Sequence, residues 1–300
     1  MKVAVLMSTY NGEKYLDAQL ESIANQTISK YISVYIRDDG STDDTLNIII
    51  KWKAKMPIHV FCGANIGPAM SFWTLLEEPN IDADYYAFCD QDDVWDKDKI
   101  EASIRCLTHN PNCHMTYCNC RIIDSEGNIL NSMRCLTQPS VSIPFLFVSG
   151  VTQGCSMTFT RELRDYIQRK KIQCVPMHDV IVMLYALDFA SVYYDKKPHF
   201  SYRVHNNNVV AKNNKSTLNR MKTTYWNWKN SSRYSMETVA LEMLHKCENL
   251  SEQDKCFLSR MSKYKTKLKD RLALAFDNSL SSISLDTLRS YRIRLLLKLL

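Results

Sequence analysis

The sequence predicts an α/β fold with a doubly wound, mostly parallel sheet, followed by a helical C-terminal extension. Short apolar runs alternate with segments of helical spacing from Val3 to Cys89, the pattern that parallel β-α-β units produce. Beyond about Asn206 this alternation thins out, and the remaining segment has helical spacing and many Lys and Arg residues. We therefore expect an α/β domain at residues 1–210 and a basic helical region at residues 211–300.

The expected elements of the first half follow from their apolar periodicity. Strands are predicted at 3–7, 34–36, 58–61 and 85–89, and helices at 14–26, 45–56 and 70–76. Ligands of such sheets bind beyond the carboxyl ends of the strands. Four of the seven glycines lie at or just after these predicted ends, where tight turns or close backbone approach are needed: Gly12, Gly40, Gly63 and Gly67.

The net charge of +6 is unevenly distributed along the chain. Residues 1–210 carry 20 Lys and Arg against 24 Asp and Glu, whereas residues 211–300 carry 18 against 8. A basic region beside a slightly acidic domain indicates an anionic partner, either nucleic acid or a membrane surface. Because the region has no recognisable nucleic-acid-binding motif, we expect no nucleic acid as partner.

The cysteine pattern favours a reduced, cytoplasmic protein. Eleven cysteines are scattered without a C-x-x-C pair, and the C-x-C formed by Cys118 and Cys120 alternates along a predicted strand, which matches a zinc site poorly. No secretory segment is recognised, and no apolar run approaches the roughly 20 residues of a spanning helix. We expect a cytoplasmic location, with peripheral attachment to the inner face of the plasma membrane left open.

The most informative motif is the acidic turn Asp-Gln-Asp-Asp at residues 90–93. Three carboxylates in a tight turn repel one another unless a cation or solvent neutralises them. Carboxylate oxygens suit Mg²⁺ or Mn²⁺, which keep open positions for substrate phosphates. The alternative is a solvated acidic loop that caps the following helix.

Two further acidic motifs follow predicted strands or precede helices. In the turn at 37–43, a carboxylate can accept the imide N–H of uracil or thymine, or the residues are ordinary turn and capping residues. Asp179, after His178 and before the apolar run 180–187, is either a general base or an N-cap.

Two loops in the second half carry polar or small residues. The loop at 202–208 contains Arg203, which suits phosphate, and His205, which suits metal or phosphate; the alternative is a polar surface loop. The segment Gly-Cys-Ser-Met at 154–157 is either a turn of close approach beneath a substrate or a bulge between strands.

Several chemistries lack their usual motifs. The sequence has no G-x-x-x-x-G-K-[ST] loop and no G-x-G-x-x-G turn, so ATP hydrolysis and dinucleotide redox chemistry lose their usual phosphate cradle. A G-x-S-x-G elbow and an H-E-x-x-H helix are also absent.

Taken in order, these motifs resemble glycosyltransferase family 2, the inverting enzymes of the GT-A fold. The acidic turn is similar to the form often seen in bacterial rhamnosyltransferase-like members. The resemblance covers residues 3 to about 210. It is carried by Ser-Thr-Tyr-Asn-Gly at 8–12, Asp-Asp-Gly-Ser-Thr-Asp at 38–43, Asn-Ile-Gly at 65–67, Asp-Gln-Asp-Asp-Val-Trp at 90–95, His-Asp at 178–179 and Tyr-Arg-Val-His-Asn-Asn-Asn at 202–208.

The resemblance implies roles for the residues at the donor end. Asp39 matches the residue that holds the pyrimidine, with Thr9 and Asn11 lining the same end of the cleft. Asn65 belongs to the element that resembles the family's Asn-x-Gly. Asp90 would face the ribose or a metal-bound water.

The resemblance also implies a metal site and a base. Asp92 matches the metal-ligating carboxylate, although Asp93 leaves the assignment ambiguous by one residue. His205 is a further metal or phosphate ligand beside Arg203, and Asp179 matches the general base. Mg²⁺ or Mn²⁺ is the implied cofactor.

The implied reaction moves a sugar from a nucleoside-diphosphate sugar to a hydroxyl of a glycan or lipid-linked glycan. dTDP-rhamnose or a UDP-hexose is favoured as donor, in bacterial surface polysaccharide synthesis. One base and no enzyme nucleophile imply inversion. Two alternatives are a sugar-phosphate nucleotidyltransferase, whose usual glycine-rich opening loop is missing here, and a non-catalytic nucleotide- or carbohydrate-binding module, which would not need both a metal turn and a base.

The end of the basic region has an imperfect amphipathic pattern that predicts docking on an anionic membrane. The alternative is a helix that packs on the catalytic domain or on a second subunit. The predicted apolar arc comprises Leu285, Leu288, Tyr291, Leu295, Leu296 and Leu299.

Overall fold

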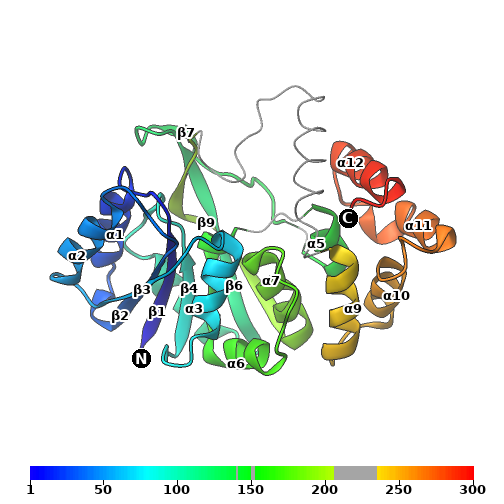
Figure 1. The fold of residues 1–300 in the computed structure, drawn as a ribbon, viewed down its shortest axis with the longest axis horizontal. Coiled ribbons are helices and arrows are strands. Elements are labelled where there is room, and N and C mark those ends of the chain that lie inside the picture. Colours follow the sequence, from blue (N-terminus) through cyan, green and yellow to red (C-terminus); the bar gives the residue numbers. More distant parts are fainter. Residues whose placement is uncertain (140, 150–152, 206–234) are drawn as a thin grey trace.

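The computed structural model describes residues 1–139, 141–149, 153–205 and 235–300. The predicted domain boundary near residue 210 and the three asparagines at 206–208 lie outside the described residues. Within them, nine strands form one sheet in the order β3-β2-β1-β4-β8-β6-β9-β5, with β7 paired to β6 (Figure 1). Helices cover both faces of this sheet, so the predicted α/β class is confirmed.

The first half of the sheet is parallel, as predicted. The strands β1 (Val3–Thr9), β2 (Ile32–Asp38), β3 (Ile58–Cys62) and β4 (Tyr85–Cys89) all run in one direction. Alternate residues of β1 belong to two different cores, because Ala4 and Leu6 face one side and Val3, Val5 and Met7 the other. A strand buried on both faces reads as a continuous apolar run, and this explains its sequence.

The three helices predicted in the first half are present, and a further helix follows the acidic turn. Three of them pack on the face of Val3: α1 (Leu16–Ala24), α2 (Thr45–Lys53) and α4 (Lys99–His109). The helix α3 (Pro68–Glu77) packs on the opposite face and begins after Gly67, whose φ of 83° needs a residue without a side chain.

The second half of the sheet is mixed. The strand β8 (Met157–Thr160) runs antiparallel to both β4 and β6 (Cys113–Ile123), whereas β9 (Ser191–Arg203) runs parallel to β6. The short strands β5 (Val94–Trp95) and β7 (Ile129–Asn131) are also antiparallel to their neighbours. The parallel arrangement therefore holds for β1–β4 and for the β6–β9 pair.

Three helices pack on the face of the sheet that includes Ala4 and Leu6. These are α5 (Ile143–Ser149), α6 (Arg161–Arg169) and α7 (His178–Phe189), and α7 is buried along nearly its whole length. The single-turn 3₁₀ helix η2 (Gly154–Ser156) lies immediately before β8 and passes close to the start of α7.

The C-terminal extension is helical, as predicted. It contains α9 (Met236–Lys246), α10 (Glu252–Met261), α11 (Leu268–Ala275) and α12 (Leu285–Leu296), with a short 3₁₀ turn, η3 (Asn278–Leu280). The helices α9, α10 and α12 begin at serine N-caps whose hydroxyls accept a backbone N–H three residues later. In the core, the rings of Phe147 in α5 and Phe257 in α10 lie 5.8 Å apart.

The structure divides the apolar arc predicted for the last helix. Leu288, Tyr291 and Leu295 are buried in the core that the C-terminal helices share with α5 and α7, whereas Leu285 and Leu296 are 70% and 53% exposed. Part of the arc thus packs against the rest of the protein, as expected from the alternative in which this helix packs on the catalytic domain. In the described ranges, the longest apolar helices remain too short to cross a bilayer.

Candidate active site

The carboxyl ends of three parallel strands meet at one edge of the sheet. Thr9 at the end of β1 is in register with Asp38 of β2, and Met7 is in register with Cys89 of β4, which directly precedes Asp90. This edge is where doubly wound sheets bind their ligands. The residues predicted to bind the nucleotide-sugar donor and the acidic turn therefore lie at the same edge of the sheet.

Two buried carboxylates organise the end of β2. Asp38 accepts the Thr9 hydroxyl at 2.9 Å and the backbone N–H of Ser41 at 2.9 Å. Asp39 forms an ion pair with Arg37 and accepts the N–H groups of Ile66 and Gly67 at 2.9 and 2.8 Å. A carboxylate offers about four acceptor positions, so Asp39 retains one beyond these three contacts.

The other predicted donor residues lie in the loops that this edge exposes. Asn11 has a φ of 46°, and its side-chain oxygen accepts the N–H of Thr42 at 2.9 Å. Asn65 is exposed. Its backbone nitrogen lies close to Gly40: a Cβ atom added to that glycine, whose φ is 83°, would be 3.5 Å from it. Thr9 is fully buried and acts on this edge through its hydrogen bond to Asp38.

The acidic turn lies between β4 and β5 and is held by the end of β9. Asp93 is completely buried; one of its oxygens accepts the N–H of Arg203 at 3.2 Å, and the other, Oδ2, has no hydrogen-bond partner. Asp92 Oδ2 lies 2.7 Å from Nε2 of His205. The structure thus brings Asp92 and His205 together while Asp93 points into the protein.

Burial and neighbouring like charges raise the pKa values of two carboxyl groups in this turn. Burial, followed by the charge of Asp92, raises the pKa of Asp90 to about 7. Burial, then Asp90, raises the pKa of Asp93 well above its usual range. A buried carboxylate oxygen without a partner and these raised pKa values are what a bound divalent cation would relieve. The residues present therefore fit a divalent cation.

Arg203 braces the turn from the end of β9. Its Nε donates to the carbonyl of Asp92 at 2.9 Å, and its Nη1 donates to the carbonyls of Asp124 and Ser125 at 3.2 and 3.1 Å. Its guanidinium also lies 4.7 Å from the ring of Tyr15. Most of the hydrogen bonds that Arg203 donates go to backbone carbonyls of the protein, so its binding of the donor phosphate stays a prediction.

Asp179 lies in the first turn of α7. The N-cap of this helix is Met177, so Asp179 is not the capping residue, and its Oδ1 accepts the adjacent N–H of Val180 at 2.8 Å. The charge of Asp179 contributes to the raised pKa of Asp90, so the two carboxylates are close enough to interact. The predicted base thus lies near the acidic turn.

His178 is a buried, neutral imidazole beside this base. Its ring stacks on Phe72 at 4.2 Å and meets Phe88 edge-on at 4.8 Å. Burial lowers its pKa to about 4, although the nearby charge of Asp179 raises it. Neither ring nitrogen has a hydrogen-bond partner. His178 is therefore uncharged at neutral pH and contributes packing beside Asp179.

The turn η2 connects the acidic turn to the base. A Cβ on Gly154 would lie 2.7 Å from Nε2 of His178 and 3.4 Å from Cβ of Asp179, so this position requires glycine. The next residue, Cys155, has its sulfur near the carboxylates of Asp90 and Asp93. The turn of close approach is present, and it places Cys155 beside the acidic turn. The sequence analysis named this segment but gave Cys155 no role, because a lone cysteine carries no motif.

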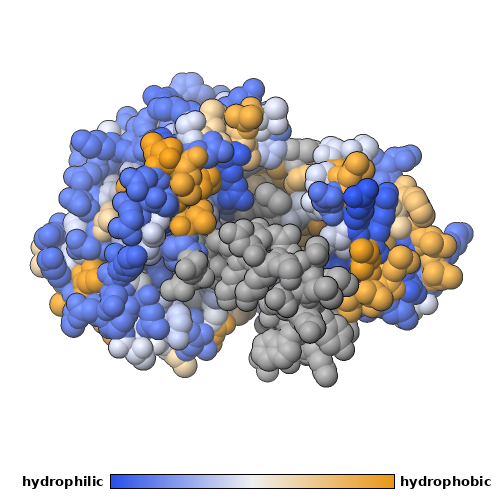
Figure 2. All heavy atoms as spheres, turned by 90° about the horizontal axis from the view of Figure 1, so that it is seen from above, coloured by the Kyte–Doolittle hydropathy of each residue, from blue (hydrophilic) through white to orange (hydrophobic). Residues whose placement is uncertain are grey.

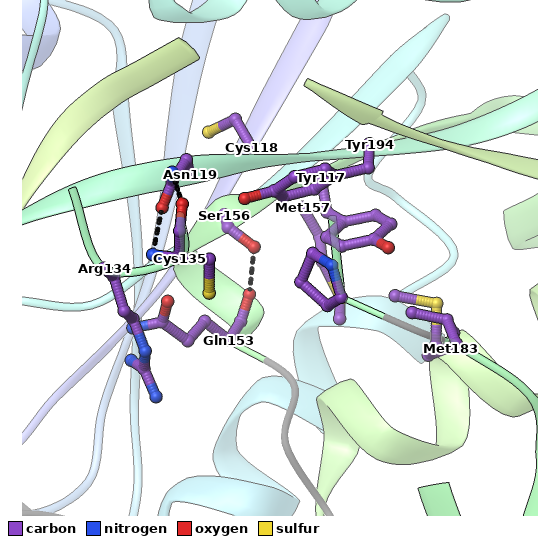
Figure 3. Close-up of a pocket in the computed structure, with 12 residues that line it drawn as sticks. Tyr117, Cys118, Asn119, Arg134, Cys135, Gln153, Ser156, Met157, Met183 and Tyr194 are labelled. Carbon is purple, nitrogen blue, oxygen red and sulfur yellow. Dashed lines mark hydrogen bonds between the residues drawn. The ribbon is translucent and has the colours of Figure 1, made fainter. Parts of the chain in front are cut away.

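A small cavity of about 40 Å³ lies beside η2 and α7 (Figure 3). Among its lining residues, the hydroxyl of Tyr194 and the amide nitrogen of Gln153 are buried without hydrogen-bond partners. Met183, one helical turn after Asp179, closes one side. This space can hold roughly two or three water-sized groups.

Comparison with known proteins supports these observations. The family model for glycosyl transferase family 2 matches residues 4–160. The chain is 33% identical over 220 residues to a dTDP-rhamnosyl transferase, RfbG, of Shigella flexneri, covering 69% of this chain and 74% of that protein.

Two solved glycosyltransferase structures share the fold. TarS of S. aureus in complex with UDP-GlcNAc has a TM-score of 0.64 at 19% identity, covering 99% of this chain and 80% of that one. The mannosyltransferase PcManGT of Pyrobaculum calidifontis, in complex with GDP-Man and Mn²⁺, has a TM-score of 0.55 at 13% identity, covering 99% and 86%. With its GT-A fold and its matching family model, the chain belongs to glycosyl transferase family 2.

Proposed function

We propose that this protein is a metal-dependent, inverting glycosyltransferase that moves a sugar from a nucleoside-diphosphate sugar to a hydroxyl of a glycan acceptor. The observation that carries the proposal is the proximity of the acidic turn and Asp179, which both lie next to η2. The similarity to a dTDP-rhamnosyl transferase favours dTDP-rhamnose, with a UDP-hexose as the second candidate, in bacterial surface polysaccharide synthesis. The acceptor is a free or lipid-linked glycan.

The donor nucleoside would bind at the ends of β1 and β2. Asp39 has one acceptor position left for the imide N–H of a pyrimidine. Asn11 and Asn65 lie on the exposed loops of the same edge, and Thr9 supports the edge through Asp38. Asp90, at the end of β4, would face the ribose or the metal.

Asp92 and His205 are the residues that would hold Mg²⁺ or Mn²⁺, with Asp90 nearby. A cation there would stabilise the negative charge that develops on the departing diphosphate. Asp93 supports the turn from its buried side, and this observation favours Asp92 as the principal ligand of the proposed metal.

Asp179 would act as the general base. One of its oxygens accepts a backbone N–H, and the other has no hydrogen-bond partner in the ranges that the structure describes. A hydroxyl bound in front of that oxygen would lose its proton as it attacks the anomeric carbon. With Asp179 as the single base and a direct attack by the acceptor hydroxyl, the configuration would invert.

Membership of the family favours transfer over the two alternatives. A nucleotidyltransferase would use the same metal but would not need a base facing the acceptor side. A non-catalytic binding module would have no need to hold like charges together at the cost shown by the raised pKa values of Asp90 and Asp93.

We predict that release of nucleoside diphosphate depends on a divalent cation and on Asp92. Purified protein is incubated with dTDP-rhamnose or UDP-glucose, a bacterial glycolipid extract and Mn²⁺, and the released diphosphate is quantified by chromatography. Chelation should abolish release, and Asp92→Asn should lower it by roughly 10²–10³, the usual effect of losing one group that stabilises developing charge.

The matched control is Asp44→Asn, an exposed carboxylate that makes no capping hydrogen bond to α2. Its turnover should equal that of the wild type. Turnover that survives both chelation and Asp92→Asn would rule out the metal role.

We predict that Asp179→Asn lowers turnover by roughly 10²–10⁴, the usual share of general acid–base catalysis, while donor affinity stays nearly constant. Donor affinity is measured by calorimetry and turnover by product formation, and Asp179→Glu should recover part of the rate. A collapse of donor affinity, or a product with retained configuration, would show that the base lies elsewhere.

We further propose peripheral attachment to an anionic membrane through a surface formed by α11 and α12. The exposed apolar residues of this surface are Leu268 and Leu272 of α11, Ile293 and Leu296 of α12, and the residues that follow the two helices, Phe276 and Leu297. Residues 262–300 carry nine Lys and Arg against three Asp. Figure 2 shows apolar side chains gathered over these helices.

Two arginines join the helices into one surface. Arg292 donates to the carbonyl of Ala275 at 2.8 Å and lies 5.4 Å from the ring of Phe276, and Arg271 donates to the carbonyl of Leu296 at 3.4 Å. Each cation near an anionic leaflet contributes about 1 kcal/mol, and like charges disfavour pairing of two copies through this surface.

We predict that the protein co-sediments with vesicles in proportion to their anionic lipid content and less at high salt. The triple variant Leu272→Ser, Phe276→Ser and Leu296→Ser should lose this binding, because these side chains are exposed and carry no core packing. The control pair Leu136→Ser and Leu241→Ser alters exposed leucines outside α11 and α12. Equal, salt-insensitive sedimentation of all three proteins would contradict the proposal.

A further inference from the structure

Cys155 is a buried thiol that the proposed reaction does not use. It lies on η2, is 1% exposed, and its sulfur lies within 4.8 Å of a carboxylate oxygen of Asp90 and of Asp93. Burial and the charges of these two carboxylates hold the pKa of the thiol well above its usual range. The thiol therefore carries its proton in the folded protein.

These three residues place potential metal ligands around one point. A ligand atom of each residue lies within 4.8 Å of the others. Ligands of a tetrahedral zinc ion bound at 2.0–2.3 Å lie about 3.3–3.8 Å apart, so the side chains would need to move by about 1 Å. Asp93 Oδ2 is buried and has no hydrogen-bond partner. This unpaired oxygen is an independent indication that a cation binds between the three side chains.

The backbone around these ligands is well supported. Gly154 packs against His178, which is itself held between Phe72 and Phe88, so the turn carrying Cys155 cannot move toward α7. Asp93 is held through its other oxygen by the N–H of Arg203. Small side-chain adjustments can therefore assemble the three ligands without a backbone rearrangement.

We propose that Asp90, Asp93 and Cys155 form a second cation site that selects thiophilic divalent cations such as Zn²⁺. Binding releases the thiol proton to solvent, and the resulting thiolate ligates the cation beside the two carboxylates. Mg²⁺ and Mn²⁺ prefer oxygen ligands and do not displace the thiol proton. The site is distinct from the Asp92–His205 pair but shares Asp90 with the donor end.

One consequence rests on the proposed function. A cation in this second site takes Asp90 away from the donor, so Zn²⁺ should inhibit transfer that Mn²⁺ supports. Binding itself does not depend on that function, so the two can fail separately.

The test measures Cd²⁺ binding, because a cadmium–thiolate bond gives a charge-transfer absorption in the ultraviolet. The parent protein carries Cys62→Ser and Cys256→Ser, which remove the exposed thiols of the described chain. We expect Cys155→Ser to abolish a high-affinity charge-transfer band that the parent shows. The matched control Cys118→Ser removes a buried thiol that belongs to no ligand cluster in the described ranges, and should keep the band.

Two further readouts complete the test. Asp93→Asn should weaken Cd²⁺ binding at least tenfold in equilibrium dialysis, and Zn²⁺ should displace Cd²⁺ from the parent. Zn²⁺ should inhibit Mn²⁺-supported diphosphate release by the parent but not by Cys155→Ser, whose thermal unfolding midpoint is checked first. An unchanged band and affinity in folded Cys155→Ser, or in Asp93→Asn if that serine variant fails to fold, would overturn the proposal.

Discussion

Repulsion among the carboxylates after β4 is the constraint on which the candidate site depends. Asp90, Asp92 and Asp93 are held within four residues, and the burial of Asp90 and Asp93 removes water that would screen their charges. The protein opposes this repulsion with groups from distant segments: the N–H of Arg203, the imidazole of His205 and the thiol of Cys155. Each of these groups is positioned by the ends of the second half of the sheet.

The mixed second half of the sheet has a direct consequence for the site. Because β8 runs antiparallel to β4, the turn η2 that precedes it lies at the same edge as the carboxyl end of β4. Gly154 allows η2 to approach Asp179 at the start of α7, while the next residue, Cys155, lies near Asp90 and Asp93. In the proposed displacement, the residues for the leaving group and for the incoming hydroxyl would thereby lie at one edge of the sheet.

The sequence alone predicted the features that depend on local pattern. Apolar periodicity placed β1–β4, and the order of short motifs indicated the family that the matching family model confirms. Contacts between distant segments were not predictable: the burial of Asp93 under Arg203, the reversed β8 and the role of Cys155 involve residues about 60 to 110 positions apart. The last helix illustrates the same limit, since only its packing shows that Tyr291 faces the core.

The most direct test of the central constraint is the thermal unfolding midpoint of the protein with and without Mn²⁺. A cation that binds the folded state alone at a hundred times its dissociation constant stabilises it by about 2.7 kcal/mol. We predict that saturating Mn²⁺ raises the midpoint of the wild type and that Asp92→Asn removes most of this rise. A midpoint that does not respond to Mn²⁺, or that responds equally in wild type and Asp92→Asn, would contradict the account.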